Sequence, residues 1–555
     1  MPNMKKIING LITFSAVMLL LLMAAVIYVK SAAHIDAPRV KDESSLQLQR
    51  INEGNGFYTL GNNWFRKSSS GLYELFVGGN AFDRGVINGK LSAELVIRQE
   101  EHFAEQIYKM VPSKFNRGFL KDFIGFFNRN LDKHIAPEFL DEIYGVSFSA
   151  SDKFQFLGSN YERLLNYHAA HDIGHALQNL ALVGCTSFGT WNSKSADSMM
   201  IIGRNFDFYV GDKFSEEKIV SFTEPDKGHK FMSVTWGGFI GAISGMNDAG
   251  LAVTINAAKS DYPLASATPV SIVTREILQY AGNIREAIAI AKSRKMFVSE
   301  SFLVASAADG KAVIIEKTPN DLDVYDPHKD YIICTNHFQS NVLSRLQKNQ
   351  EQLKESASPY RYERMQELID VNGKITVQKT VDILRDRKGL HGASIGNGNE
   401  KAVNQLISHH SIVFEPQKLR VWVSTSPWQL GRYVCYDLNK VFALKGMKVN
   451  REISEDSLGI EADPFLQTEE FRRFERFRKY KQALIEGQEV DADSLVASNP
   501  DFYLAYVLAG DYMYRKKDFK KSLSFYKKAL TREIATGNEE AHIRMQIKKI
   551  ESKQQ

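Results

Sequence analysis

The sequence predicts an α+β fold, in which strands and helices share one central domain and further helices lie at both ends of the chain. Past residue 185, short apolar runs are separated by Gly, Asn and Asp, a texture typical of buried strands. Two segments with apolar residues at three- and four-residue steps interrupt these runs and indicate helices. The chain has 555 residues, too many for one hydrophobic core, and this length favours about three or four domains.

The first element is a membrane-targeting segment over residues 1–33. Lys5 and Lys6 precede an uncharged, mostly apolar run over residues 7–29, and a helix needs about 20 apolar residues to span a bilayer. Because the lysines stay on the cytoplasmic side, we expect an uncleaved anchor that leaves the rest of the chain extracytoplasmic, in the periplasm or outside the cell. The alternative is secretion after signal cleavage at about residue 33, where Ser31-Ala32-Ala33 offers small residues.

Two segments separate this anchor from the strand-rich domain. Residues 34–70 are polar and irregular, and we expect them to form a membrane-proximal linker. Residues 71–184 are mostly helical in pattern, because the stretches 91–110 and 119–131 carry apolar residues at helical spacing. A helical N-terminal segment is therefore expected to precede the strands.

The strand-rich domain is expected to span residues 185–445. Its two helical segments are residues 270–280 and 284–292. Strands, two helices and then strands again indicate two sheets with helices packed outside them. The predicted strands are the runs 199–203, 231–236, 251–256, 302–305, 312–316, 331–335, 411–414 and 419–424.

The C-terminal region, residues 446–555, is helical and highly charged. Part of it approximates one tetratricopeptide repeat, through Tyr506, Ala509, Gly510, Met513, Ser522, Tyr526 and Ala529. Such repeats usually need about three copies to stand alone, and no second copy is evident. We expect this region to cap its neighbours, with a protein partner at these helices as the alternative.

Composition excludes several classes of protein. The chain has 44% hydrophobic and 24% charged residues, which is ordinary for a globular protein. A net charge of +5 is too small for this length to indicate nucleic-acid binding. Three cysteines, Cys185, Cys334 and Cys435, cannot supply a disulfide framework. The sequence lacks a P-loop, a dinucleotide fingerprint, a zinc ribbon and the nucleophile elbow of Ser-His-Asp enzymes, and no cofactor is expected.

The dipeptide Gly184-Cys185 carries the candidate chemistry, and Arg204 and Asp207 follow it closely. If the Gly184–Cys185 bond is cut, the cysteine gains an α-amine with a reference pKa of about 7.7–8.0, which suits a base for its own thiol. The thiol can make this cut by attacking the Gly184 carbonyl, and glycine lets the backbone bend there. The alternative is a buried structural cysteine in a strand.

Five separated blocks place this dipeptide in a family pattern. In their order along the chain they resemble the N-terminal-nucleophile (Ntn) hydrolases, in the branch of acyl-coenzyme A:6-aminopenicillanic acid acyltransferase and the choloylglycine hydrolases. The resemblance covers roughly residues 75–440, and it implies a four-layer αββα sandwich for the central domain. The blocks are Gly184-Cys185-Thr186-Ser187, Gly203-Arg204-Asn205-Phe206-Asp207, residues 245–256, Thr335-Asn336-His337 and Ser358-Pro359-Tyr360-Arg361-Tyr362.

The resemblance implies a nucleophile and two residues that serve it. Cys185 attacks the substrate carbonyl. Arg204 lies beside the sulfur, where its fixed positive charge favours the thiolate; the alternative is a surface arginine in a salt bridge. Asp207 accepts a hydrogen bond from the freed α-amine and orients it, unless it is a turn residue after a strand.

Two asparagines are implied as donors to the oxyanion. Asn256 places an N–H there and Asn336 a side-chain amide, and such donors are commonly worth about 3–4 kcal/mol of barrier each. The alternative for each is a turn former after a strand. Arg361 holds Asn336 or another polar group, and Arg364 is close enough in sequence to compete for this role.

The implied protein matures by cleavage before Cys185, after which the N-terminal helical chain stays associated. It hydrolyses a linear amide of an N-acyl small molecule through an acyl-thioester. One alternative is acyl transfer to an amine; coenzyme A is not expected outside the cytoplasm, which favours hydrolysis. Another is a catalytically inactive, membrane-tethered interaction protein. The motifs do not specify whether the substrate is a bile-salt conjugate, a penicillin or another N-acyl compound.

Two groups of histidines are candidates for other roles. His168, His171 and His175 share one helix face and could suit a metal, but Asp172 is their one clear carboxylate partner. We expect them to be structural or to assist processing, with no metal bound. The pair His409-His410, before a predicted strand, is expected to be structural.

Overall fold

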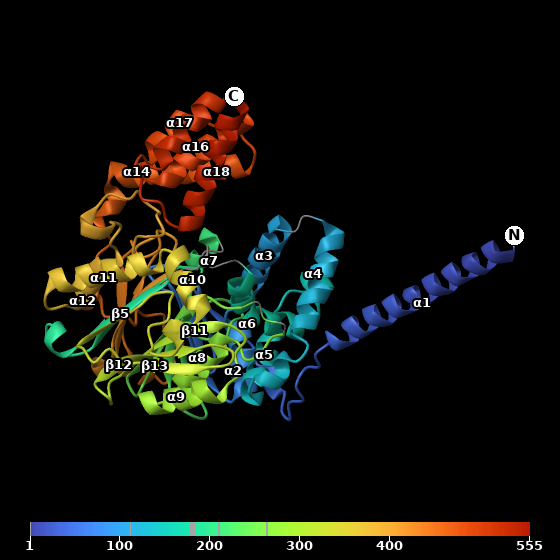
Figure 1. Cartoon of the computed structure of the whole chain (residues 1–555). Helices are drawn as coiled ribbons and strands as arrows, with labels where there is room; N and C mark the ends of the chain where they lie inside the picture. The colour runs from blue at the N-terminus through green and yellow to red at the C-terminus, as the bar shows by residue number, and fades with distance from the viewer. Residues whose placement is uncertain are drawn as a thin grey trace.

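The computed structural model describes residues 2–110, 113–177, 184–208, 211–261, 263 and 265–554, and these form a mixed α+β structure (Figure 1). The described strands make one sheet of eleven strands and one of six. Helices cover both sheets and continue at both ends of the chain. The predicted α+β class is therefore confirmed.

The N-terminal helix α1 (Pro2–Ala32) projects from the body of the molecule (Figure 1). Within it, Ile8–Ala32 has a mean hydropathy of 2.6 and is long enough to cross a membrane. The end of α1 contacts α4 (Lys114–Phe127), where the rings of Tyr28 and Phe126 lie 6.1 Å apart. By length and composition α1 fits both an anchor and a signal sequence.

The larger sheet has the strand order β1-β2-β3-β4-β7-β8-β9-β10-β11-β12-β13. Its β4–β7 pair is parallel and the other described pairs are antiparallel. Because β4 precedes Cys185 and β7 follows it, the two sides of the proposed cut share this sheet. Its strands are β1 (Ile51–Gly54), β2 (Phe57–Leu60), β3 (Asn63–Lys67), β4 (Tyr73–Gly79), β7 (Ile219–Pro225), β8 (Phe231–Thr235), β9 (Ser244–Asn247), β10 (Leu251–Ala258), β11 (Ser299–Ser306), β12 (Lys311–Lys317) and β13 (Leu322–Tyr325).

Strands β1 to β3 differ from the irregular linker expected over residues 34–70. Phe57, Trp64 and Phe65 are buried here, and aromatic residues favour strands. Strand β2 turns directly into β3 through Gly61-Asn62, with Gly61 at a φ of +61°, a conformation that suits a tight hairpin. The segment is polar on average, so these few buried aromatic side chains did not indicate strands in the sequence.

The smaller sheet has the order β14-β5-β6-β15-β16-β17, and its described pairs are all antiparallel. Strand β5 begins one residue after Cys185 and pairs with both β6 and β14. The family blocks around residues 185, 204 and 335 thereby come side by side. The strands are β5 (Thr186–Thr190), β6 (Ile201–Phe206), β14 (Tyr331–Cys334), β15 (His410–Glu415), β16 (Arg420–Ser424) and β17 (Tyr433–Asp437).

A core of side chains from both sheets lies between them, including Phe222 and Leu303 of the larger sheet and Ile412 and Val423 of the smaller. The outer face of the larger sheet packs on helices α5 (Pro137–Ser147), α6 (Asn160–Leu177), α8 (Val270–Tyr280) and α9 (Ile284–Ser293). The outer face of the smaller sheet packs on α11 (Ser358–Asn372) and α12 (Val377–Leu384). Strand β10 is buried along its whole length, as its apolar sequence requires.

The remaining helices complete this body. Helix α2 (Ala81–Leu91) and the start of α3 (Ala93–Met110) share a buried apolar cluster with β2, β3, β4 and β7 of the larger sheet. The short α7 (Asp212–Glu216), α10 (Gln347–Glu355) and α13 (Leu438–Phe442) follow later in the chain. The C-terminal helices form a group above the sheets (Figure 1) with its own apolar core. They are α14 (Glu469–Ile485), α15 (Ala492–Ser498), α16 (Tyr503–Arg515), α17 (Phe519–Ala529) and α18 (Gly537–Gln554).

Helices α2 and α5 cross at a contact that requires glycine on both sides. A Cβ on Gly85 would lie 2.0 Å from the Glu142 carbonyl oxygen, and one on Gly145 would lie 2.4 Å from the Phe82 oxygen. Both obstacles are backbone atoms, which cannot rotate away. The close approach lets Glu142 of α5 reach Arg84 of α2 at 2.5 Å in the buried interior.

We predict that Gly145→Ala destabilises the N-terminal segment. Overpacking a tight site costs about 1–3 kcal/mol, measurable by urea unfolding of the full chain in detergent. The matched control is Gly118→Ala on α4, where a Cβ meets nothing within 4 Å and alanine should stabilise the helix by about 0.5–1 kcal/mol. Equal effects of the two substitutions would contradict the close crossing.

Candidate active site

The Cys185 thiol lies at the start of β5, next to the guanidinium of Arg204 on β6. The pairing of Ser187 with Arg204 fixes the two strands in register, and Arg204 Nη2 lies 3.7 Å from Cys185 Sγ. The thiol is 1% exposed and Arg204 is fully buried. The nucleophile and the cation that the sequence singled out are therefore in contact.

Four acceptors hold the Arg204 guanidinium in place. Nη2 donates to the Ile255 carbonyl at 2.6 Å as well as to the sulfur. Nη1 donates to the Ile243 carbonyl at 3.1 Å and to the Ser244 hydroxyl. Since the three oxygen acceptors belong to the larger sheet or the residue before β9, Arg204 spans the space between the sheets with one fixed orientation.

Burial raises the pKa of the Cys185 thiol above its ordinary value, although the Arg204 charge opposes this shift. The Asp207 charge raises the pKa further, and a backbone hydrogen bond from Asp207 lowers it. In the uncut chain, the effect of desolvation on this pKa outweighs the opposing effect of the Arg204 charge. The thiol is protonated in this state at neutral pH.

The Asp207 carboxyl is fully buried and has two described partners. Its Oδ1 accepts from the Ser408 hydroxyl and its Oδ2 accepts from Gln405 Nε2 at 3.2 Å. Burial raises its pKa to about 7, against the opposing effects of Ser408, Arg361 and Arg204. Near neutral pH this carboxyl can therefore hold or release a proton.

Both backbone polar groups of Gly184 form hydrogen bonds. Its N–H donates to the Asp207 carbonyl at 3.2 Å, and its own carbonyl accepts from Gln405 Nε2 at 2.7 Å. A Cβ at this position would lie 2.3 Å from Gln405 Nε2, so the approach of Gln405 requires glycine.

Asn256 lies on β10 and is fully buried. Its Oδ1 accepts from Ser187 at 2.7 Å, and its Nδ2 donates to the Cys334 carbonyl at 3.1 Å. Both ends of the side chain thus have partners and join β10 to β5 and β14.

Asn336 and Arg361 are in direct contact, as the sequence comparison implied. Arg361 Nη2 donates to Asn336 Oδ1 at 2.7 Å, and Asn336 Nδ2 donates to the Ala257 carbonyl at 2.9 Å. Ser358 accepts from the Asn336 backbone at 2.7 Å, so the fourth and fifth blocks hold each other. Arg364 instead pairs with Asp386 through Nε at 2.9 Å, which separates the two candidate arginines.

All six sequence-predicted residues lie in one buried cluster, each no more than 3% exposed. The charges of Asp207 and Cys185 act on the pKa of Arg361, although burial is the main cause that lowers it. The structure therefore brings the whole set together; the set is Cys185, Arg204, Asp207, Asn256, Asn336 and Arg361.

Sequence reasoning missed four polar partners of this cluster. The Ser244 hydroxyl accepts a hydrogen bond from Arg204, and His410 Nε2 lies 2.9 Å from the same oxygen. Gln405 and Ser408 hold Asp207. His410, expected to be structural, thus contacts a hydrogen-bond acceptor of Arg204. Gln405 and Ser408 come from a polar loop before a strand, and such loops carry no distinguishing signal.

The upstream histidines show no metal geometry in the described part of the chain. His168 Nδ1 lies 2.7 Å from the Leu164 carbonyl, and its Nε2 accepts from the Ile240 N–H at 3.0 Å. Both ring nitrogens are occupied, and burial lowers the pKa of His168 to about 4. The side chains of His171 and His175 lie outside the described residues, and the described ones contain no cluster of metal-ligand type.

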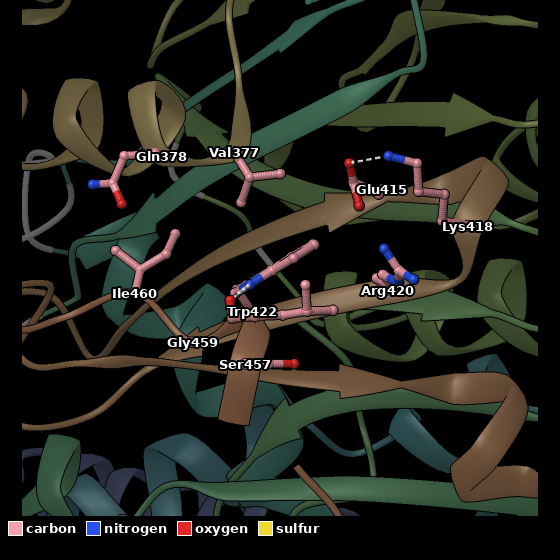
Figure 2. Close-up of a pocket in the computed structure, with 10 residues that line it drawn as sticks. Val377, Gln378, Glu415, Lys418, Arg420, Trp422, Ser457, Gly459 and Ile460 are labelled. Carbon is pink, nitrogen blue, oxygen red and sulfur yellow. Dashed lines mark hydrogen bonds and ion pairs between the residues drawn. The ribbon is translucent and has the colours of Figure 1, made fainter. Parts of the chain in front are cut away.

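A surface pocket lies away from this cluster on the smaller sheet (Figure 2). Trp422 forms part of its wall, and Lys418 and Glu415 make an ion pair of 2.9 Å beside it. None of the six candidate residues lines this pocket. We assign it no catalytic role.

Comparison with known proteins agrees with the resemblance drawn from the motifs. Residues 191–426 match the family model of acyl-coenzyme A:6-aminopenicillanic acid acyl-transferase. This match confirms the predicted resemblance. It begins after Cys185 and contains the other five candidate residues.

One curated relative and two solved structures are also similar to this chain. An uncharacterized protein of Archaeoglobus fulgidus is 24% identical over 406 residues, which cover 65% of each chain. A Caenorhabditis elegans ortholog of N-acylethanolamine-hydrolyzing acid amidase is 18% identical, covering 42% of this chain and 93% of its own, with a TM-score of 0.30. A variant of conjugated bile acid hydrolase from Clostridium perfringens is 14% identical, covering 49% and 100%, with a TM-score of 0.32.

We predict that Asp207 makes stability depend on pH. The ordinary pKa is 3.8 and the folded value is about 7, so between these values the folded state holds a proton that the unfolded state has released. The free energy of unfolding therefore falls as pH rises through this window. Asn cannot titrate, so Asp207→Asn should gain stability relative to its parent from about pH 4 to pH 7.

The comparison is made by urea unfolding in a Cys185→Ala background, which removes the thiol and any cleavage that depends on it. Below about pH 4 the difference between the two proteins should become constant, because Asp207 is then protonated in both states. A difference that stays the same from pH 4 to pH 8 would contradict the raised pKa.

Proposed function

We propose that this chain is a cysteine Ntn amidohydrolase that activates itself by cutting the Gly184–Cys185 bond. The observation that carries the proposal is the contact of the Cys185 thiol with Arg204. Cys185 directly follows Gly184, whose backbone N–H and carbonyl both form hydrogen bonds. The substrate class we propose is a small molecule with a linear N-acyl amide bond.

Burial of the thiol supports a maturation step. At 1% exposure the sulfur cannot meet an external amide, whereas it is adjacent in sequence to the Gly184 carbonyl. After the cut the N-terminal chain should stay bound, since β4 and β7 pair over seven positions. Glu142 of that chain also contacts Arg275 of α8 at 3.1 Å in the buried interior.

In the cut enzyme, the α-amine of Cys185 takes the thiol proton, and the sulfur attacks the amide carbonyl. Asp207 orients the amine, while Arg204 stabilises the negative sulfur. Asn256 and Asn336 donate to the oxyanion as it forms. The amine product leaves with a proton, and water, activated by the same α-amine, hydrolyses the acyl-thioester.

Two other functions use the same observations differently. An acyltransferase would pass the acyl group from Cys185 to an amine instead of water, which is detected as a new amide product when an acceptor amine is added. An inactive, membrane-tethered interaction protein would stay whole and would not react with a thiol-directed acyl analogue. The intact contacts of Arg204 and Arg361 favour a working enzyme.

We further propose the division of the chain into an anchor (1–33), a membrane-proximal segment (34–70), an N-terminal helical segment (71–184), a catalytic domain (185–445) and a C-terminal helical region (446–555). The packing of helices outside both sheets supports a four-layer αββα sandwich. The pair α16 and α17, with Ser522 donating to the Gly510 carbonyl at 2.8 Å, supports one tetratricopeptide-like repeat, and a protein partner there is part of the proposal.

The proposed location is membrane-anchored through α1, with the catalytic domain extracytoplasmic in the periplasm or outside the cell. Its support is the apolar length of Ile8–Ala32 together with the lysines before it. Secretion after cleavage near residue 33 is the alternative. The mass of the mature N-terminal chain separates the two, because only an anchored form retains residues 1–33.

We predict that Cys185→Ala abolishes both maturation and amide hydrolysis, because one sulfur performs both. N-terminal sequencing of the purified wild-type protein should show a chain that starts at Cys185, and the variant should remain whole. Activity is measured on fluorogenic N-acyl aminocoumarins of several acyl lengths. A variant that still hydrolyses these amides, or a wild type that stays whole yet active, would refute the proposal.

We predict that Arg361→Lys lowers kcat with a smaller effect on KM, because lysine cannot hold both Asn336 and the Glu400 carbonyl. Loss of one oxyanion donor costs about 10²–10³ in kcat, which sets an upper limit for a misplaced Asn336. The control is Arg364→Lys, three residues along the same helix and paired with Asp386. It should lower stability and leave kcat within a few-fold of wild type.

A further inference from the structure

Gln405 occupies a position that hydrolysis of an external amide does not explain. It lies in the loop between α12 and β15 and is 3% exposed. Its amide nitrogen contacts the Gly184 carbonyl oxygen at 2.7 Å and Asp207 Oδ2 at 3.2 Å. Both neighbours are acceptors, so the NH₂ group must face them, and its two hydrogens account for both contacts.

The Gly184 carbonyl is the group that carries the charge when the Gly184–Cys185 bond is cut. A donor to an oxyanion acts at about 2.7–3.1 Å from the oxygen, in a buried site where no reorganisation is needed. Gln405 Nε2 already lies 2.7 Å from the ground-state carbonyl oxygen, on which this charge develops. Asn256 Nδ2 and Asn336 Nδ2 instead donate to the Cys334 and Ala257 carbonyls in the same state.

The absence of a side chain at position 184 makes room for this contact. A Cβ there would lie 2.3 Å from Gln405 Nε2 and 2.6 Å from its Oε1. Glycine is therefore needed for the contact with Gln405.

We infer that Gln405 is the oxyanion donor of the maturation cut, a catalytic residue for cleavage of this chain that is distinct from the donors proposed for the substrate. The inference rests on the proposed self-cleavage. It divides the site into two sets of donors: Gln405 for the Gly184 carbonyl, and Asn256 with Asn336 for the carbonyl of an external amide.

The step balances with groups that are present. The Asp207 carboxylate takes the thiol proton, and the Cys185 sulfur bonds to the Gly184 carbonyl carbon. The carbonyl electron pair moves to the oxygen, where Gln405 donates. On collapse the C–N bond breaks and the nitrogen takes the proton back from Asp207, which leaves a thioester and a free α-amine. One water then hydrolyses the thioester to the Gly184 carboxylate and the free thiol.

Asp207 suits this shuttle because burial raises its pKa to about 7, and its charge acts on the Cys185 thiol. The α-amine cannot serve as base for this step, since it does not exist until the bond is broken. The cut and the later hydrolysis thus need different bases as well as different oxyanion donors.

The test is a pulse–chase of the full chain, synthesised in a cell-free system with detergent, in which the loss of whole chain is followed by mass. Gln405→Leu keeps the size of the side chain without the donor, and cleavage should slow by about 10²–10³-fold. The matched control is Gln352→Leu on α10, which replaces another buried glutamine and should cleave at the wild-type rate. Cleavage of Gln405→Leu at the wild-type rate would overturn the inference.

A double-mutant cycle separates loss of the donor from a damaged fold. Gly184→Ala should slow cleavage because its Cβ displaces the Gln405 amide, and it should cost little more in a Gln405→Ala background, where no amide remains to be displaced. Penalties that simply add would overturn the inference. If the wild-type chain is never cut, the proposed function itself fails. If the wild type is cut and the Gln405 variants are cut equally fast, only the role of Gln405 is refuted.

Discussion

The site depends on one buried cation, Arg204. A guanidinium cannot lose its charge in a protein interior, so it needs fixed acceptors around it. Ile243, Ser244 and Ile255 supply oxygens from the larger sheet, while Arg204 itself stands on the smaller one. This requirement fixes the sheets relative to each other. One N–H of Nη2 then points to the Cys185 sulfur. The position of the nucleophile follows from satisfying this charge.

A second buried ion group ties together the two sides of the proposed cut. Glu142 of α5 lies between Arg84 of α2 and Arg275 of α8, at 2.5 Å and 3.1 Å. Two of the three charges precede Cys185 and one follows it. Removing one partner from such a group leaves an unpaired buried charge and costs about 3–5 kcal/mol. The Glu142–Arg275 contact therefore joins the N-terminal segment to the part of the chain after Cys185, in addition to the β4–β7 pairing.

Much of the site could be predicted from sequence because its residues follow or end apolar runs, so that a polar residue stands out against an apolar stretch. Arg204, Asn256 and Asn336 all have this form, and the order of the blocks brought them together. Gln405 has no such sequence signal, because its role depends on a tertiary contact between its loop and Gly184. The strands in 51–67 were missed for a related reason: a few buried aromatics stabilise them within a polar average.

The loop that carries Gln405 also explains why the C-terminal helices matter to the site. Asn399 donates to the Glu533 carbonyl at 2.9 Å and Lys401 pairs with the Glu533 side chain at 2.5 Å, so the C-terminal region holds this loop from outside. From inside, the Glu400 carbonyl accepts from Arg361 at 2.7 Å. The same short segment therefore orients Arg361, which holds Asn336, and presents Gln405 to Gly184. A helical region that follows the strands along the chain thus fixes a loop serving both the proposed cut and the proposed hydrolysis, and the two chemistries share one support even though their oxyanion donors differ.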